Sequence, residues 1–166
     1  MSMLKKTLLT VFLTFLAGIS FSLQAEPLSY GEKDACSGCG MIVSAWPGPK
    51  AQVIEADEKK ETFCSVRCML CHTLDRVDLE QLALAVHDTA RVDWEHPGEG
   101  VAIDAKKAWF VVGSRRRATM GASIAPFATE DEARLFQETW GGTLMSYGEL
   151  SVERLKCPKK KSLTQK

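Results

Sequence analysis

The hydrophobic pattern opens with an almost unbroken apolar run, Leu8 to Phe21, behind a head that carries Lys5 and Lys6. A basic head, a short apolar run and a small residue such as Ala25 are typical of an export signal that is cleaved. The run is too short to favour a permanent membrane span. We therefore expect residues 1–25 to be a cleaved signal, and the mature chain to be a soluble periplasmic protein.

Beyond the signal, short apolar stretches alternate with turn residues, which predicts short strands. Met41–Trp46 has the β-branched and aromatic content of a strand, and Pro47-Gly48-Pro49 ends it. Ala51–Ala56 alternates apolar and polar residues and should pair back as a second strand. Glu61–Phe63 follows a charged turn and should form a short third strand.

From Cys64 to Leu74 the pattern changes to a helical period. At about 100° per residue, Cys64, Cys68 and Cys71 fall on one face, and the apolar residues gather on the opposite side. The three thiols therefore have a helix face of their own. A second short helix is expected over Leu79–Val86, where apolar residues recur with helical spacing.

The second half of the chain repeats the plan of the first. Strands are expected at 108–112 and 118–125, followed by a helix that begins at Thr129 and stops at Gly141-Gly142. Glu132 lies three residues after Thr129, which makes a capping box. A last strand is expected at residues 143–147.

These elements predict an α+β fold in which antiparallel hairpins are covered by helices. Roughly 140 residues remain after the signal, enough for one domain and too few for two ordinary ones. We expect that domain to span residues 26–156, and a basic, disordered tail to follow over residues 157–166.

Charge and composition exclude several functions. Among 166 residues, Lys plus Arg and Asp plus Glu each number 21, so the formal net charge is zero. A general nucleic-acid binder would show a basic excess. No Ser/His/Asp set, phosphate-binding glycine loop or pair of catalytic carboxylates can be assigned in the sequence, so we expect a protein that is not an enzyme.

The six cysteines carry the candidate chemistry. An even number in an exported protein first suggests disulfides, but five of them lie between Cys36 and Cys71, which is more typical of metal ligands. The stretch Cys36-Ser-Gly-Cys39-Gly-Met41 adds a thioether to two thiols. Such soft ligands suit Cu(I), and thiolates also suit zinc or iron–sulfur clusters. Cys157 is either a free thiol or the partner of Cys71.

Short motifs follow one another along nearly all of the mature chain. They are Cys39-Gly-Met41, Phe63 with Cys68-Met-Leu70, Ala102-Ile-Asp-Ala105 with Ala108-Trp-Phe-Val-Val-Gly-Ser114, Thr119-Met-Gly121 with Pro126-Phe127, and Gly141-Gly142. In this order they resemble the NosL family, accessory copper chaperones for the assembly of nitrous oxide reductase.

The resemblance implies a periplasm-facing Cu(I) carrier built from two ββα units in a treble-clef-like arrangement. Copper binding in the family is attributed to a Cys-x-Met motif, which matches Cys39 and Met41, and to a methionine that aligns with Met120. These three are the primary candidate ligands. The secondary candidates are the other clustered cysteines, Cys36, Cys64, Cys68 and Cys71.

The implied partners are nitrous oxide reductase and its assembly and transport machinery, with membrane contact only through them. The chain departs from the family in one respect that bears on the membrane. The usual lipoprotein cysteine is missing, because Leu16-Ala17-Gly18 is followed by Ile19. Tethering by a lipid is therefore not expected.

Two other functions remain open for the cysteines. Cys39, Cys64 and Cys68 also resemble the heavy-metal-binding TRASH pattern, whose spacing is somewhat shorter, and with Cys36 they would form a structural or sensory zinc site. A thiol–disulfide oxidoreductase built on Cys36-x-x-Cys39 is disfavoured. Such a motif normally lies at a helix N-terminus, whereas glycine and a strand-like run follow it here.

Overall fold

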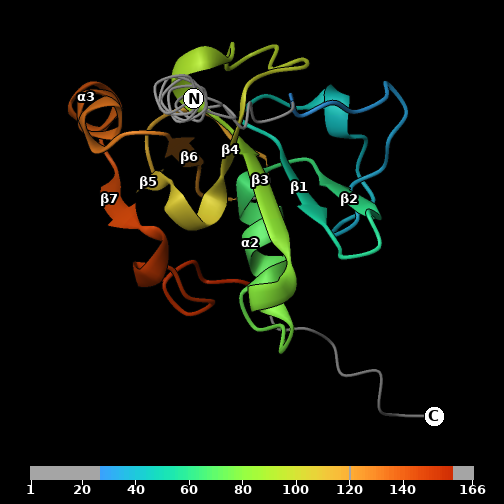
Figure 1. Ribbon diagram of the computed structural model, residues 1–166. Helices are drawn as coiled ribbons and strands as arrows, with labels where there is room; N and C mark the ends of the chain where they lie inside the picture. The colour runs from blue at the N-terminus through green and yellow to red at the C-terminus, as the bar shows by residue number, and fades with distance from the viewer. Residues whose placement is uncertain (1–26, 120, 159–166) are drawn as a thin grey trace, which may run out of the picture.

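A computed structural model describes residues 27–119 and 121–158 of the chain. The expected export signal and the candidate ligand Met120 lie outside the described residues. Within them the chain forms two antiparallel sheets and two α-helices (Figure 1). The α+β fold with antiparallel hairpins and helices is confirmed.

The first unit contains a four-stranded sheet and helix α2. Its elements are β1 (Ala51–Ile54), β2 (Lys60–Phe63), α2 (Val66–Thr73), β3 (Ala83–His87) and β4 (Ala102–Asp104). The strand order is β2-β1-β3-β4, and every neighbouring pair is antiparallel. Ala51 at the start of β1 lies opposite Phe63 on one side and Val86 on the other.

The second unit contains a three-stranded sheet and helix α3. Its elements are β5 (Trp109–Val112), β6 (Ile124–Phe127), α3 (Glu130–Trp140) and β7 (Thr143–Ser146). The order is β6-β5-β7, so the hairpin β5–β6 is followed by a helix and by a strand that returns beside β5. The first unit follows the same path through β1, β2, α2 and β3.

The two units also match at the corner where the second strand meets the helix. Phe63 ends β2 and Phe127 ends β6, and in each case the N-cap residue of the helix comes two positions later. The caps are Ser65 and Thr129, whose side chains accept a main-chain N–H from the third residue of their helix. Such caps satisfy a main-chain donor that would otherwise lack a partner at the helix start.

Several expected elements differ from the structure, among them the strand expected at 118–125, since β6 begins only at Ile124. The segment expected to be a second helix is a 3-10 turn, η2 (Leu79–Gln81), followed by β3. Leu82, Leu84 and Val86 are buried and the intervening Ala83 is exposed, so the alternating period of a strand outweighs the helical spacing.

The strand expected at Met41–Trp46 is the 3-10 turn η1 (Val43–Ala45). The segment has the residues of a strand but pairs with the rest of the chain through a single bridge, between Ala35 and Ile42. The other 3-10 turns are η3 (Thr89–Arg91), η4 (Ala105–Lys107) and η5 (Tyr147–Glu149).

Helix α2 connects the two sheets, because it contacts β1 and β2 of the first and β6 of the second. The main core therefore takes fully buried side chains from both units, for example Val53, Met69 and Phe110. Each such side chain stabilises the fold by about 1.5–3 kcal/mol. A smaller cluster around Phe127 lies under α3.

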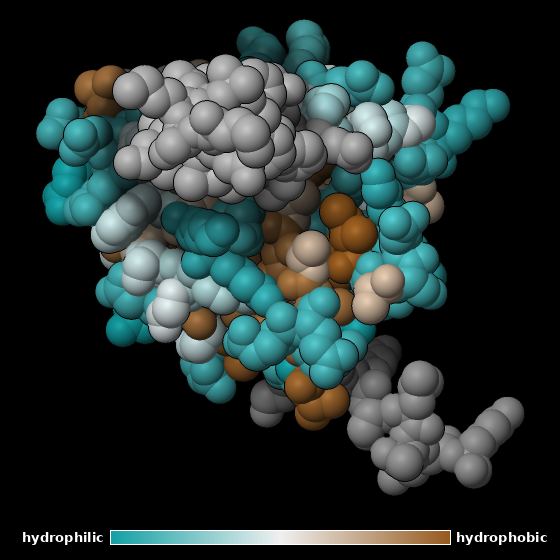
Figure 2. Space-filling view, viewed as in Figure 1, coloured by the Kyte–Doolittle hydropathy of each residue, from teal (hydrophilic) through white to brown (hydrophobic). Residues whose placement is uncertain are grey.

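Cys36 and Cys64 belong to the main core. The face shown in Figure 2 is mostly hydrophilic, with smaller apolar areas near its middle. Within the residues described, no helix combines the length and the apolar character needed to cross a membrane.

Candidate metal centre

The first two cysteines of the site lie on a tight turn. Gly40 N–H donates to Cys36 O over 2.8 Å, and Cys36 N–H donates to Met41 O over 2.8 Å. Gly40 has a φ of 75°, a conformation that favours glycine. Ser37 N–H donates to Thr62 O over 2.9 Å, which attaches the turn to β2. The turn thus presents the thiols of Cys36 and Cys39 next to the end of that strand.

The other two cysteines lie at the corner between β2 and α2. Cys64 directly follows β2 and is fully buried. Ser65, the N-cap, accepts the N–H of Cys68 over 3.1 Å, which fixes the first turn of the helix. Cys64 comes just before the cap and Cys68 three residues after it. Both thiols lie on the side of the corner that faces the turn with Cys36 and Cys39.

The four sulfur atoms all lie within 4.8 Å of one another. The Sγ atoms of Cys36 and Cys68 are 3.5 Å apart, and those of Cys39 and Cys64 are 3.6 Å apart. We call these four residues the cysteine cluster. Cys36 and Cys64 are buried, whereas Cys39 and Cys68 are half-buried, so one side of the cluster is accessible.

Gly38 allows the turn to come this close to the helix. A Cβ atom at Gly38 would lie 2.7 Å from Cys68 Sγ, well inside van der Waals contact. Any side chain at this position would push the turn away from Cys68 or force the thiol out of the cluster. The glycine between the two cysteines is therefore required for the packing of the site.

The cluster favours one negative charge at Cys36. Hydrogen bonds from the thiols of Cys64 and Cys68 lower the pKa of Cys36. The hydrogen bond with Cys36 raises the pKa of Cys64 to about 12, and the same interaction raises that of Cys68. A cation that replaces these protons would convert the shared hydrogen bonds into sulfur ligation.

Lys50, which precedes β1, is a fully buried cation close to the cluster. Its Nζ donates to three main-chain carbonyls, Trp46 O at 2.5 Å, Cys64 O at 3.1 Å and Pro47 O at 3.5 Å. Burial lowers the pKa of Lys50 to about 8, and the thiolates of Cys64 and Cys36 act in the opposite direction. Sequence reasoning missed this residue, because a lysine between Pro49 and a strand is normally exposed.

The donor set of the cluster suits a thiophilic ion. Four thiolates in mutual contact are the ligand set of structural zinc, and thiolates also select Cu(I) over hard cations. Cys36, Cys39, Cys64 and Cys68 were all candidates from the sequence, and the structure brings them together. Met41 is half-buried, and its carbonyl closes the turn that carries Cys36.

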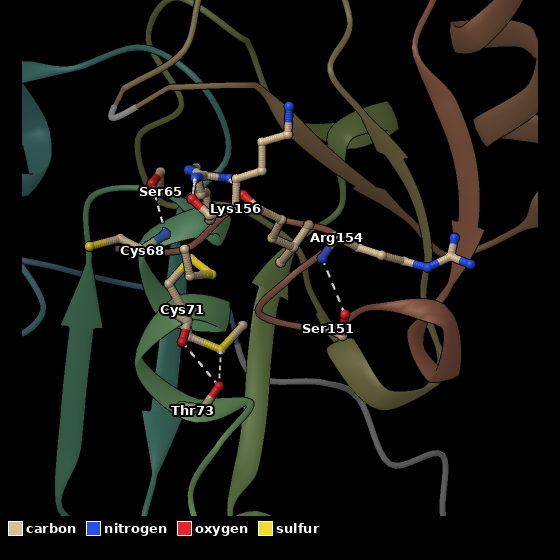
Figure 3. The surroundings of a disulfide bond; sticks show 11 residues. Ser65, Cys68, Cys71, Thr73, Ser151, Arg154 and Lys156 are labelled. Atoms are coloured by element: carbon tan, nitrogen blue, oxygen red, sulfur yellow. Dashed lines mark hydrogen bonds between the residues drawn. A yellow bond between two sulfur atoms is a disulfide. The ribbon is translucent and has the colours of Figure 1, made fainter. Parts of the chain in front are cut away.

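One candidate ligand was wrong. Cys71 was expected to share the metal-binding face of α2, but its sulfur forms a disulfide with Cys157, 86 residues away in the sequence. A disulfide sulfur carries no thiolate to offer a metal. Figure 3 shows the Cys68 sulfur pointing away from this disulfide, so the bond and the cluster occupy different sides of the helix.

The disulfide belongs to an attachment of the C-terminal segment to α2. The guanidinium of Arg67 donates to the carbonyls of Leu155 and Lys156, the second over 2.9 Å. Periodicity placed Cys71 on the correct helix, but the spacing of residues in a sequence does not show which distant segment packs beside it. Cys157 is thus held in the fold, at the start of the segment expected to be a disordered tail.

Taken together, two ββαβ units present four free cysteines in an arrangement that suits a thiophilic metal ion. A family model for NosL matches residues 27–155. The copper-binding lipoprotein NosL of Stutzerimonas stutzeri is 39% identical over 150 residues, which cover 87% of this chain and 78% of that protein. The chain belongs to the NosL family.

Two further relatives agree. The copper-binding lipoprotein NosL of Achromobacter cycloclastes is 36% identical over 125 residues, covering 72% of this chain and 65% of that protein. The crystal structure of the copper chaperone NosL from Shewanella denitrificans superposes with a TM-score of 0.70 at 32% identity, covering 76% of this chain and 96% of that one. The resemblance found from the motifs is thereby confirmed.

Proposed function

We propose that this protein is a Cu(I) metallochaperone that carries copper in the cysteine cluster and delivers it to a periplasmic copper enzyme. The observation that carries the proposal is the grouping of four free thiols within 4.8 Å in a member of the NosL family. The relatives described as a copper chaperone and as copper-binding lipoproteins support copper as the cargo. Soft sulfur ligands favour its monovalent form.

The unequal burial of the four cysteines suits a carrier. Cys36 and Cys64 are inside the core, while Cys39 and Cys68 reach the surface. An incoming sulfur ligand from a partner can approach the copper from that side and replace the accessible thiolates one at a time. Met41, beside Cys39 on the same turn, remains a candidate ligand during this exchange, as does Met120.

The motifs favour nitrous oxide reductase as the recipient, because they resemble those of its accessory copper chaperones. The family relatives called lipoproteins support export, and we place this protein on the periplasmic side of the membrane. In this function the chain performs no chemistry on a substrate. Its residues bind copper, protect it from water and release it to a partner.

The ligand assignment can be tested by anaerobic competition with a chromogenic Cu(I) chelator. The reduced mature protein should bind about one equivalent, and Cys39→Ser and Cys64→Ser should each weaken binding by at least about 10-fold. The double variant Cys71→Ser/Cys157→Ser is the control, since it removes two cysteines outside the cluster. Unchanged affinity in both single variants would contradict the assignment.

Delivery requires a separate assay. Copper-loaded protein should activate copper-free nitrous oxide reductase faster than the same amount of chelated Cu(I), and the Cys64→Ser variant should lose that advantage. If loaded protein and chelated copper act equally, the protein binds copper but does not deliver it to this enzyme.

A zinc module is the second candidate function, because the same four thiolates match a closed structural zinc site. A structural zinc ion would be coupled to folding, so its removal would unfold the domain. A metal-free reduced protein that keeps its circular dichroism spectrum and cooperative melting would exclude this function. Competition between Zn(II) and Cu(I) at equal concentrations gives the preferred ion directly.

A further inference from the structure

The buried ammonium of Lys50 needs an explanation, because an isolated charge inside a protein is costly unless it is paired. Lys50 is fully buried, yet the acceptors of its Nζ are all neutral main-chain carbonyls. In the described part of the chain no carboxylate forms an ion pair with it, although other lysines and arginines do form such pairs. A neutral side chain would fill this position at lower cost.

The ammonium of Lys50 lies next to the cysteine cluster. One of its acceptors, at 3.1 Å, is the carbonyl of Cys64 itself. The negative groups that act on Lys50 are the sulfurs of Cys64 and Cys36, the two buried members of the cluster. Lys50 therefore lies beside Cys64, one of the two buried members of the cluster.

The second unit provides an internal comparison. Ala51 pairs with Phe63 in the first sheet as Trp109 pairs with Phe127 in the second, so the residue equivalent to Lys50 is Ala108. Ala108 is also buried, and the second unit contains no cysteine. The shared fold thus tolerates a small neutral residue at this position, and the buried cation occurs only in the unit that carries the thiols.

The charge of a loaded site gives the lysine a role. Three or four thiolates around a monovalent copper ion leave a net negative charge, part of which lies in the core with the buried Cys36 and Cys64. A buried negative charge is stabilised by a nearby cation much more than the same charge would be in water. The ammonium beside Cys64 is placed to supply that stabilisation from the side that solvent does not reach.

We propose that Lys50 is the buried counter-charge of the cysteine cluster, and that it raises the affinity for the thiolate-bound metal ion. The inference rests on the proposed function, because it requires that the cluster binds the cargo. Lys50 does not contact the metal. It acts through the charge of the thiolates and through its hydrogen bond to the main chain of Cys64.

The test compares Cu(I) affinity in four proteins, the wild type and the variants Lys50→Met, Lys50→Arg and Lys106→Met. Lys106→Met is the matched control, since Lys106 Nζ also donates to two main-chain carbonyls, Leu79 O at 3.0 Å and Glu80 O at 3.1 Å, in a region without cysteines. All are measured reduced and anaerobic, near neutral pH, by competition with a chromogenic Cu(I) chelator. Thermal unfolding of the metal-free proteins is recorded in parallel.

We expect Lys50→Met to weaken Cu(I) binding by at least about 10-fold, the size typical of losing an outer partner of a metal site. Lys50→Arg, which keeps the charge, should bind within about 3-fold of the wild type, and Lys106→Met should bind like the wild type. Equal losses in Lys50→Met and Lys50→Arg would show a purely structural role and overturn the proposal. Wild-type affinity in Lys50→Met would overturn it as well.

Two outcomes separate this proposal from the proposed function. If Lys50→Met does not fold, Lys50→Gln replaces it, because glutamine is neutral but keeps a side-chain N–H donor for the carbonyls. Weaker binding by Lys50→Gln than by Lys50→Arg then supports the charge, and equal binding contradicts it. If the wild type binds no Cu(I), or if Cys64→Ser does not weaken binding, the copper site itself fails and the role of Lys50 fails with it.

Discussion

The two units of this protein share one architecture and differ at one corner. In the second unit, Ala128 follows β6, and Glu132 at the third position of α3 donates its main-chain N–H to the N-cap Thr129, whose hydroxyl donates to the Glu132 carboxylate over 2.9 Å. In the first unit the equivalent positions are Cys64 and Cys68. The second unit shows that the corner folds without thiols, so the fold itself does not require the cysteines of the first.

The helices of the two units also differ in how they are fixed to the rest of the fold. Helix α3 stops at Gly141, which has a φ of 71° and donates its N–H to Gln137 O over 2.7 Å. Helix α2 is instead attached to the C-terminal segment by the Cys71–Cys157 disulfide and by Arg67. The helix that carries Cys68 of the cysteine cluster is thus the one that is fixed at several points. A site that must hold soft ligands in a defined arrangement benefits from such support.

The largest effect is expected from making the corner of the first unit resemble that of the second. The double variant Cys64→Ala/Cys68→Ser copies Ala128 and removes two of the four thiols. Cu(I) affinity should fall by about 1,000-fold or more, since losing even an outer-shell partner costs about 10- to 100-fold.

The fold of the same double variant should survive. The free energy of unfolding of the metal-free protein should change by about 1–2 kcal/mol, because only small buried groups are removed. Chelator competition and urea unfolding measure the two quantities. Loss of the folded state would contradict the view that the corner is independent of its cysteines.

Acid should affect the first unit more than the second. His87 at the end of β3 is fully buried, and burial lowers its pKa from 6.5 to about 4, with the charge of Lys50 adding to the effect. The unfolded chain takes up this proton below pH 6.5, whereas the folded chain resists it until about pH 4. Stability is therefore lost as the pH falls through this window, by about 3 kcal/mol in total.

The equivalent residue of the second unit is Tyr147, whose pKa burial raises, so it stays neutral throughout that window. His87→Phe should abolish the acid-dependent part of the loss, measured as the difference in unfolding free energy between pH 7 and pH 4. Tyr147→Phe is the control and should leave the difference unchanged. If His87→Phe loses as much unfolding free energy between pH 7 and pH 4 as the wild type does, groups other than His87 cause the loss.

Alanine substitutions at two glycines should separate the effect on copper binding from the effect on the stability of the fold. In the second unit, a Cβ at Gly142 would lie 2.8 Å from Val111 Cγ1, and its φ is 101°. Gly142→Ala should therefore cost about 2 kcal/mol of stability and leave copper affinity unchanged. Gly38→Ala should do the reverse, with about 10-fold weaker Cu(I) binding and a change in stability below about 1 kcal/mol, because only Cys68 Sγ obstructs the new methyl group.

Gly148 is the control for both, since no atom lies within 4 Å of a Cβ at that position. Melting temperature and chelator competition on the three alanine variants test the distinction. A Gly38→Ala protein that binds copper like the wild type would show that the turn can relax away from the helix.

The smallest expected effect comes from the two helix caps. Ser65→Ala and Thr129→Ala should each lower the free energy of unfolding by about 1 kcal/mol, the usual cost of a lost N-cap. Only Ser65→Ala should also weaken copper binding, by a few-fold, since Ser65 holds the main chain of Cys68. Equal copper affinity in the two variants would indicate that the first turn of α2 needs no cap to place its thiol.

Much of this site could be predicted from the sequence because it depends on local geometry. The helix begins at Val66 rather than at Cys64 as expected, but the four-residue spacing of Cys64 and Cys68 still brings both thiols to one side of the corner. The Cys36–Cys39 turn is short enough to act as one unit. The helix start at Thr129 was predicted for the same reason, and the structure confirms Thr129 as the N-cap. The expected capping box is only half formed, because the Glu132 carboxylate accepts the Thr129 hydroxyl and not the Thr129 main-chain N–H.

Features that depend on distant packing could not be decided from the sequence. Cys157 could be free or paired with Cys71, and the choice depends on where the C-terminal segment returns. The burial of Lys50 depends on the packing of the distant Cys64 corner beside it. The segment that forms β3 fits both a helical and an alternating pattern. Its place beside β1 decides between them.

The most direct test of the central claim is a crystal structure of the reduced protein loaded anaerobically with one equivalent of Cu(I). Anomalous difference density at the copper absorption edge locates the ion without assumptions about its ligands. We predict a single strong peak in contact with sulfur atoms of both the turn, Cys36 or Cys39, and the corner, Cys64 or Cys68. A peak that contacts Cys39 and Met41 but neither Cys64 nor Cys68 would contradict the account.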